Sequence, residues 1–267
     1  MSFAAALPER YRVILCDIWG VVHDGVDLYP GAAERLRQWR SEGRRVILIT
    51  NAPRTAQSVE QQLARIGLPR DAWDGISTSG EAGIAALTAL DTPVGFLGTE
   101  EDRAILDSRG VRFAVGEDFG HLACTGLETQ SMDIAPYDER LQRWAGRGVT
   151  MHCLNPDRLV IRGGTPEACA GALADVYERL GGTVEWYGKP HETIYRHALG
   201  LAGDPPPEAV LAIGDSLKTD VLGAARMGFD CLFVTGGIHA GEPFPSDFAG
   251  ENGLGDWQPV AIAASLA

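Results

Sequence analysis

Four apolar runs in the sequence end in polar residues of the types that handle phosphate or metal ions. The residues that follow these runs are Asp17, Thr50 with Asn51, Lys189, and Asp215. In open parallel sheets, ligands bind beyond the carboxyl ends of the strands. If the runs are strands of one such sheet, a nucleophile, a hydroxyl group, a cation and a metal ligand meet at one edge.

Asp17, Lys189 and Asp215 have the chemistry of a phosphotransfer centre. A carboxylate acts as a nucleophile when it is ionised, oriented and faced by positive charge, which Lys189 can supply to Asp17. Mg²⁺ takes oxygen ligands, usually one or two carboxylates together with substrate phosphate oxygens. We therefore predict that Asp17 and Asp215 hold a Mg²⁺ cofactor.

The remaining phosphoryl oxygens need hydrogen-bond donors. The Thr50 hydroxyl and the backbone N–H groups around Gly20 and Asn51 can donate to them. Phosphoryl transfer depends on an in-line nucleophile and on preorganised countercharge around the equatorial oxygens. The substrate-binding residues predicted in this way are Gly20, Thr50, Asn51 and Lys189.

Strand-like and helix-like patterns alternate along the chain, which favours an α/β fold with a mainly parallel sheet. Helix patterns cover 32–42, 56–66 and 192–199, and a turn rich in Gly and Pro follows Val22. In the middle of the chain the strands are shorter. There we expect strands at 94–98, 112–115, 122–126, 149–154 and 159–162, and helices at 138–145 and 166–180.

These patterns predict a doubly wound core with an inserted α/β cap. The core is expected to comprise 1–79 and 186–267, because strand signals resume after the middle segment, and the cap is expected to comprise 80–185. Such an arrangement places the ends of the core strands next to an insertion that can cover them.

Composition excludes several classes of protein. The 267 residues carry a net charge of -13, which argues against nucleic acid or an anionic membrane as the main partner. The five cysteines are scattered and never spaced as CxxC, so we expect neither a disulfide framework nor a zinc site. The N-terminal residues lack the pattern of a signal peptide, and no apolar run has the length of a membrane span. We expect a cytoplasmic protein.

The motifs resemble those of the haloacid dehalogenase-like superfamily, and the resemblance covers roughly 12–237. Four matching elements occur in the family order: Asp17-Ile18-Trp19-Gly20-Val21, Thr50-Asn51, Gly188-Lys189-Pro190 and Gly214-Asp215-Ser216-Leu217-Lys218-Thr219-Asp220. Three further stretches look like the subgroup with the second kind of α/β cap (class IIA): Ser77-Thr78-Ser79-Gly80-Glu81, Asn155-Pro156-Asp157 and Tyr187-Gly188-Lys189-Pro190-His191. That subgroup includes nucleotide, sugar-phosphate, pyridoxal-phosphate and aryl-phosphate phosphatases.

The resemblance implies a role for each motif residue. Asp17 would attack phosphorus and become an aspartyl-phosphate, while Thr50 and Lys189 would bind the phosphoryl group. The metal would be held by Asp17, Asp215 and the backbone carbonyl of Trp19, with Asp220 supporting its water or Lys189. The implied partner is a small phosphorylated metabolite, and caps of this kind often mediate homodimers in the family.

Trp19 departs from the family pattern, because the general acid/base of the family is a carboxylate two residues after the nucleophile. General acid–base catalysis contributes about 10²–10⁴ in rate. Its loss leaves the departing alkoxide unprotonated and the attacking water unactivated. Metal binding should survive, since the ligand at this position is a backbone carbonyl. We therefore expect slow or specialised turnover.

Three interpretations of Trp19 stay open. His23 or Asp24 in the turn after the first strand can replace the missing acid, although the ordinary expectation for a residue in such a turn is a solvated side chain. The substrates can have good leaving groups, such as aryl or acyl phosphates. Alternatively, the protein binds a phosphorylated ligand with a vestigial catalytic site.

Metal-independent dehalogenation is a third functional hypothesis. Dehalogenases of the same superfamily also carry an aromatic residue two positions after the nucleophile, but they have no need for the full acidic pair after the last core strand. This sequence retains Asp215, Asp220 and Lys189. Their retention favours Mg²⁺ and phosphate over halide.

Overall fold

A computed structural model describes residues 6–162, 165–236 and 244–267. The chain divides into two compact units. The core unit comprises Met1–Thr50, Ala56–Ser77 and Lys189–Ala267, and the inserted unit comprises Asn51–Thr55 and Thr78–Gly188. Each unit has its own parallel sheet, and we describe the two separately.

The core unit contains a six-stranded sheet of order β12-β11-β10-β1-β2-β3. Its strands are β1 (Val13–Asp17), β2 (Arg45–Thr50), β3 (Gly75–Thr78), β10 (Val210–Gly214), β11 (Asp230–Val234) and β12 (Ala261–Ala263). β1 lies between β10 and β2, is parallel to both, and is buried at every residue. Continuous apolar runs are typical of parallel strands that are covered on both faces, and the Val-Ile-Leu-Cys run of β1 is such a strand.

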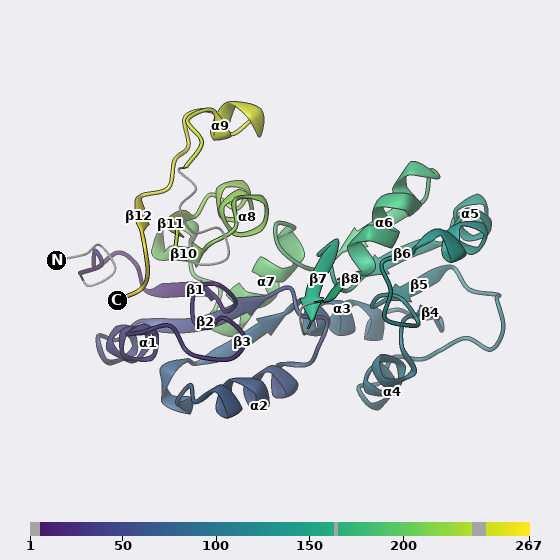
Figure 1. Ribbon diagram of the computed structural model, residues 1–267, viewed down its shortest axis with the longest axis horizontal. Helices are drawn as coiled ribbons and strands as arrows, with labels where there is room; N and C mark the ends of the chain where they lie inside the picture. The colour runs from purple at the N-terminus through teal and green to yellow at the C-terminus, as the bar shows by residue number, and fades with distance from the viewer. Residues whose placement is uncertain (1–5, 163–164, 237–243) are drawn as a thin grey trace. The chain divides into compact units, whose positions relative to one another are not determined.

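Helices lie on both sides of the core sheet, with α1 and α2 on one side and α7 and α8 on the other (Figure 1). The core-unit helices are α1 (Ala32–Ser41), α2 (Ala56–Ile66), α7 (Glu192–Ala202), α8 (Leu222–Arg226) and α9 (Phe248–Glu251). The helix predictions at 32–42 and 56–66 are confirmed. α7 continues past the predicted end to Ala202, where Gly203 takes the left-handed conformation that ends helices.

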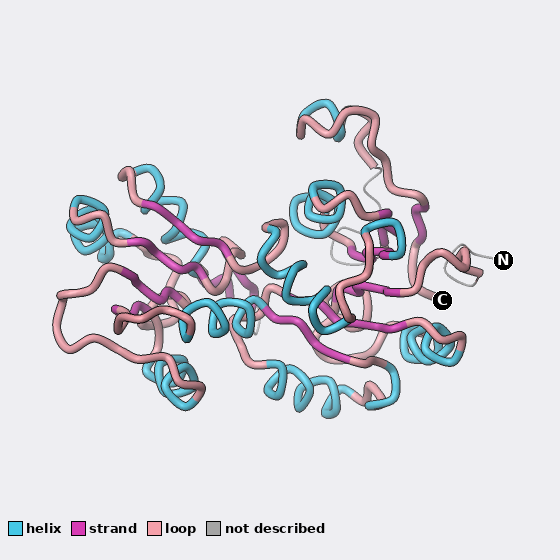
Figure 2. The backbone as a smooth tube through the Cα atoms, turned by 180° about the vertical axis from the view of Figure 1, so that it is seen from behind, coloured by secondary structure: helices cyan, strands magenta, loops and turns pink. Residues whose placement is uncertain are grey.

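The inserted unit contains a four-stranded parallel sheet of order β4-β5-β6-β9 and a separate antiparallel hairpin. The sheet strands are β4 (Gly95–Leu97), β5 (His121–Cys124), β6 (Thr150–Cys153) and β9 (Thr183–Trp186), and the hairpin strands are β7 (Leu159–Arg162) and β8 (Thr165–Ala168). The helices are α3 (Ser79–Thr88), α4 (Glu100–Ser108), α5 (Asp138–Gly146) and α6 (Ala170–Arg179). Figure 2 shows helices around the strands of each unit.

The predicted α/β fold with mainly parallel sheets is confirmed, but two elements of the inserted unit differ from the prediction. No strand forms at 112–115, where Phe113 makes an isolated bridge to Val94 and Val115 is fully exposed. Without burial, the apolar residues of this segment gain nothing from sheet formation. The helix predicted to begin at 166 begins at Ala170, because Thr165–Ala168 pairs with β7 instead.

All five cysteines are buried and free. Within the described ranges, no helix combines the length and the apolar character that crossing a bilayer requires.

Candidate active site

Asp17, Thr50 and Asp215 lie at the carboxyl ends of three adjacent strands. In the sheet register, Asp17 is paired with Ile49, directly before Thr50. On the other side of β1, Cys16 is paired with Ile213, two residues before Asp215. All three polar side chains are buried. The parallel register therefore brings a carboxylate, a hydroxyl and a second carboxylate to one edge of the core sheet.

Lys189 is the cation of this cluster. Its Nζ donates hydrogen bonds to Asp17 Oδ1 at 2.6 Å and to Asp220 Oδ1 at 2.7 Å, and all three side chains are buried. Burial alone would lower the pKa of Lys189, but Asp17 and Asp220 outweigh it and raise that pKa. The lysine is therefore an ammonium group that faces Asp17.

The cluster holds more negative than positive charge. Oxygens of Asp17, Asp215 and Asp220 lie within 4.8 Å of one another, against the single ammonium group of Lys189. Burial raises the pKa of the Asp17 carboxyl well above its usual range, Asp220 raises it further, and Lys189 opposes the shift. A buried surplus of carboxylates is costly unless it is compensated. A divalent cation with oxygen ligands compensates it, so these residues fit Mg²⁺.

Two glycines let the carboxylates come together. A Cβ at Gly20, where φ is +79°, would lie 2.0 Å from Asp215 Oδ2, and a Cβ at Gly214 would lie 2.1 Å from Asp220 Cγ. Asp220 itself comes from a π-helical turn, Leu217–Val221, a geometry that occurs often at functional sites. The turn directs this carboxylate back under the end of β10.

Tyr195 on α7 supports the same turn, although sequence reasoning did not single it out. Its hydroxyl donates to the carbonyl of Thr219 at 3.4 Å and occupies space that only a glycine at 223 leaves open. Burial and the charge of Asp220 raise the pKa of Tyr195 well above its usual range, so the phenol stays neutral. Its place in the sequence, six residues after Lys189, gave no motif by which to find it.

The Trp19 side chain packs against the turn that follows β1. It is 39% exposed and contacts the ring of His23 edge-on, with the ring centroids 5.0 Å apart. Among the described residues, no backbone N–H of a turn or loop donates to the Trp19 carbonyl oxygen. The family pattern implies that this oxygen is a metal ligand, a role that stays a prediction.

His23 is buried, with 1% of its surface exposed, so the expectation of a solvated turn residue is wrong. Its Nδ1 accepts a hydrogen bond from the Gly25 N–H at 2.8 Å. Asp24 caps the same turn, because its Oδ1 accepts from the N–H groups of Asp27 and Val26. These two hydrogen bonds lower the pKa of Asp24. Both side chains thus serve the structure of the turn.

Asn51 groups with the inserted unit rather than with the core unit. Its side-chain amide donates to Asp157 Oδ1 at 2.9 Å. The side-chain amide of Asn51 thus has a partner of its own, whereas the predicted role of its backbone N–H in binding phosphate stays a prediction. The seven other predicted site residues lie in the core unit: Asp17, Trp19, Gly20, Thr50, Lys189, Asp215 and Asp220.

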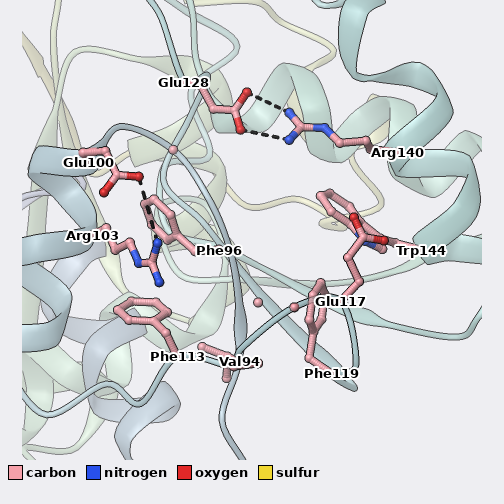
Figure 3. Close-up of a pocket in the computed structure, with 14 residues that line it drawn as sticks. Val94, Phe96, Glu100, Arg103, Phe113, Glu117, Phe119, Glu128, Arg140 and Trp144 are labelled. Carbon is pink, nitrogen blue, oxygen red and sulfur yellow. Dashed lines mark hydrogen bonds and ion pairs between the residues drawn. The ribbon is translucent and has the colours of Figure 1, made fainter.

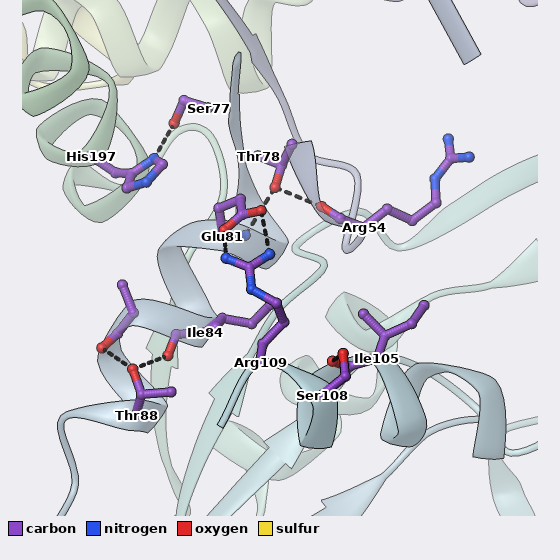
Figure 4. A network of polar contacts seen from close by, with 11 residues as sticks. Arg54, Ser77, Thr78, Glu81, Ile84, Thr88, Ile105, Ser108, Arg109 and His197 are labelled. Atoms are coloured by element: carbon purple, nitrogen blue, oxygen red, sulfur yellow. Dashed lines mark hydrogen bonds and ion pairs between the residues drawn. The ribbon is translucent and has the colours of Figure 1, made fainter. Parts of the chain in front are cut away.

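The stretch 77–81, which the sequence singles out, starts α3 (Figure 4). Thr78 Oγ1 accepts from the Glu81 N–H at 2.9 Å and donates to the carbonyl of Arg54 at 2.7 Å. Glu81 forms a bidentate pair with Arg109. Gly80 allows a close approach to the carbonyl of Pro53. Within the inserted unit, this motif ties α3 to the segment that follows β2.

A hollow of about 440 Å³ lies on the inserted unit (Figure 3). Figure 3 shows two groups of side chains on opposite sides of it: Phe96, Phe113 and Arg103 against Phe119, Trp144 and Glu117. Its charged side chains are paired within the unit, Glu128 with Arg140 through two hydrogen bonds and Arg103 with Glu100 and the Phe113 ring. This hollow lacks the surplus positive charge that a phosphate site needs.

Relatives that are named phosphatases show that this α/β protein is a phosphatase-type hydrolase. The chain belongs to the haloacid dehalogenase-like hydrolase family. The haloacid dehalogenase-like hydrolase model matches residues 14–112, and a second, HAD-hydrolase-like model matches residues 186–266.

Relatives support the same assignment. Ribonucleotide monophosphatase NagD of Escherichia coli K12 is 31% identical over 234 residues, which are 84% of this chain and 88% of that protein. A haloacid dehalogenase-like hydrolase from Brucella suis 1330 has a TM-score of 0.81 and 34% identity, and the match covers 98% of this chain and 97% of that one. The predictions of the family and of its class IIA subgroup are confirmed, and the protein is a phosphatase of small phosphate esters.

A more distant solved structure shares the fold. Glycerol phosphate phosphatase from Mycobacterium tuberculosis, in complex with magnesium, has a TM-score of 0.72 and 21% identity over 99% of this chain and 77% of that one.

Proposed function

We propose that the protein hydrolyses small phosphate esters with Mg²⁺ through an aspartyl-phosphate on Asp17. The observation that carries this proposal is the buried Asp17 carboxylate, hydrogen-bonded to the ammonium group of Lys189 and beside two further carboxylates. A nucleophilic carboxylate needs such a positive neighbour. The phosphatase relatives and the magnesium complex of the M. tuberculosis enzyme support it.

Asp17, Asp215 and the Trp19 carbonyl oxygen would hold the Mg²⁺, with Asp220 beside them. The ion would supply countercharge to the phosphoryl oxygens. Lys189 supplies countercharge from the protein, and Thr50 donates a hydrogen bond from the end of β2. The backbone N–H groups that follow Asp17 and Thr50 can donate to the remaining oxygens.

The reaction has two displacements. The Asp17 carboxylate attacks phosphorus, the bond between phosphorus and the ester oxygen breaks, and the alcohol leaves as its oxyanion. Water then attacks the phosphorus of the aspartyl-phosphate, which releases inorganic phosphate and restores Asp17. In both steps Lys189 stays protonated and stabilises charge on the transferred group.

We propose that the leaving group departs without a proton from either His23 or Asp24, whose side chains are engaged in the turn. His23 uses Nδ1 to accept from Gly25, and Asp24 uses its carboxylate to cap the turn. Unassisted departure favours ester oxygens that are stable as anions. Aryl and acyl phosphates are therefore the substrates that we expect to be hydrolysed fastest.

The first experiment is hydrolysis of p-nitrophenyl phosphate by the wild type and by Asp17→Asn, each with Mg²⁺ and with chelator. We expect turnover that requires both Asp17 and Mg²⁺. Asp107→Asn, an exposed carboxylate change on α4, serves as the matched control and should retain activity. Phosphate binding without such turnover would instead favour a vestigial site. Chloride release from haloacids that persists in chelator would favour a dehalogenase.

A further inference from the structure

Trp19 presents an exposed aromatic ring two residues after the nucleophile. With 39% of its surface exposed, it is the one aromatic side chain among the exposed large hydrophobic residues of the described ranges. Contact between an exposed indole and water is unfavourable. The free energy falls when another apolar or planar group covers the ring. The exposed face of Trp19 is therefore a surface that a ligand can cover.

The turn holds the indole in place. The edge-to-face contact with His23 has ring planes inclined by 67°. Gly25, at φ +102°, lies so close that a Cβ there would be 2.3 Å from the Cη2 atom of the indole. His23 and Asp24 fix this turn through hydrogen bonds to its own backbone. The indole is thus preorganised rather than free to move, which lowers the entropic cost of binding a ligand against it.

The backbone of Trp19 is fixed beside the carboxylates. Gly20 packs against the Asp215 carboxylate and donates its N–H to the carbonyl of His23 at 3.0 Å. The platform formed by the indole and the turn that supports it therefore begins next to the phosphoryl-binding cluster of the same unit.

We propose that Trp19 is a specificity residue whose exposed indole stacks on a planar aromatic ring in the leaving group of the substrate. This inference rests on the proposed function. It names aryl phosphates as the substrate class, because their planar ring is held a short, fixed distance from phosphorus by the ester oxygen. Aryl phosphates also have a leaving oxygen that needs little protonation. Both effects of Trp19, the missing general acid and the exposed indole, therefore favour aryl phosphates as substrates.

The test compares ligands of equal charge and similar size. Phenyl phosphate and cyclohexyl phosphate differ in planarity, so titration calorimetry with Mg²⁺ and the inactive Asp17→Asn protein measures stacking apart from apolar burial. We expect phenyl phosphate to bind about threefold to tenfold more tightly. Adding Trp19→Leu should remove this preference, whereas adding Trp19→Phe should preserve most of it. Adding Val26→Ser, at an exposed apolar residue of the same turn, should leave it unchanged.

Binding of inorganic phosphate distinguishes a failure of the stacking role from a failure of the proposed function. If Asp17→Asn binds inorganic phosphate but binds both esters equally, the stacking role of Trp19 is overturned and the proposed function stands. Equal losses for both esters in Trp19→Leu would overturn it too, because they would show a packing role. If inorganic phosphate does not bind at all, the proposed function and the stacking role both fall.

Discussion

The replacement of one carboxylate by an indole separates two tasks that share a single residue in the family pattern. In the family pattern the metal ligand at position 19 is the backbone carbonyl, which any residue supplies, whereas the indole side chain has no acidic proton to transfer. Metal and phosphate binding should therefore be less affected by the substitution than proton transfer. This asymmetry allows each task to be measured alone.

Restoring the carboxylate tests the proton-transfer task. Trp19→Asp should raise kcat/KM for propyl phosphate by a larger factor than for phenyl phosphate, because alkoxides depend on protonation and the aryl substrate also loses its platform. The gain for the alkyl substrate has an upper range of about 10²–10⁴. Steady-state rates for both esters check this. Equal gains, or none, would show that position 19 does not limit the reaction.

A pair of glycine variants tests the close approach at Asp215. Gly20→Ala and Gly43→Ala both introduce a Cβ at positive φ, with roughly 1–2 kcal/mol of strain each. Only Gly20→Ala places that Cβ against a carboxylate, since nothing lies within 4 Å of the Cβ position at Gly43. Gly20→Ala should weaken Mg²⁺ binding and Gly43→Ala should not, as measured by calorimetry. If Gly20→Ala and Gly43→Ala bind Mg²⁺ equally well, Asp215 can move away from the new Cβ and still hold the ion.

At the scale of elements, the ends of the core strands were predictable and the turns beyond them were not. Apolar runs with polar ends locate β1, β2 and β10, because burial on both faces permits few other residues. The π-helical turn at Leu217–Val221 depends on how Asp220 and Tyr195 pack, which no local pattern encodes. The burial of His23 likewise depends on its contact with Trp19. Long-range packing decides these features, so sequence periodicity misses them.

A polar row crosses the sheet of the inserted unit. His152 on β6 lies between His121, with ring nitrogens 3.0 Å apart, and the Tyr187 hydroxyl at 2.7 Å, while Glu185 is its neighbour on β9. Burial and, secondarily, the neighbouring His121 lower the pKa of His152 to about 4. The row is therefore held together by a neutral imidazole.

This pKa makes stability depend on pH. Because the folded pKa of His152 lies below its ordinary value, the unfolded chain binds more protons between about pH 6.5 and pH 4. The contribution, about 3 kcal/mol, is present above pH 6.5 and is lost as pH falls toward 4. Denaturant unfolding should show that the free energy of unfolding falls less between pH 6.5 and pH 4 for His152→Gln than for the wild type.

Tyr187→Phe is the matched control for that prediction. Since burial is the main cause of the shift, removing the hydroxyl should keep most of the pH dependence. Identical slopes for His152→Gln and the wild type would contradict the assignment.

At the scale of the whole molecule, the negative charge in the core unit should make stability respond to Mg²⁺. An ion that binds only the folded state stabilises it by about 2.7 kcal/mol at 100 times its dissociation constant. Thermal unfolding should therefore shift upward with Mg²⁺ in the wild type and in Asp107→Asn, but not in Asp215→Asn. A similar shift in all three proteins would place the ion elsewhere.

The division predicted from the sequence, a core of 1–79 with 186–267 and a cap of 80–185, stays a prediction. Alternating patterns and a run of shorter strands indicate an insertion in the middle. The grouping of Asn51–Thr55 with the inserted unit had no such signal, because it arises from contacts such as Asn51 with Asp157 and Pro53 with Gly80. Residues adjacent in sequence, Thr50 and Asn51, thus fall into different units.

The strand order of the core sheet has a consequence for the nascent chain on the ribosome. β1 gains β2 as a neighbour soon after it is made, but its other neighbour, β10, is made only after the whole inserted unit. The inserted unit draws its strands from an almost continuous stretch and can form in the meantime. Until β10 emerges, the edge of β1 that pairs with it stays open, and the strand is almost entirely apolar. Open apolar edges of this kind can pair with other chains. Asp17, at the end of β1, is therefore synthesised well before the strand that completes its surroundings.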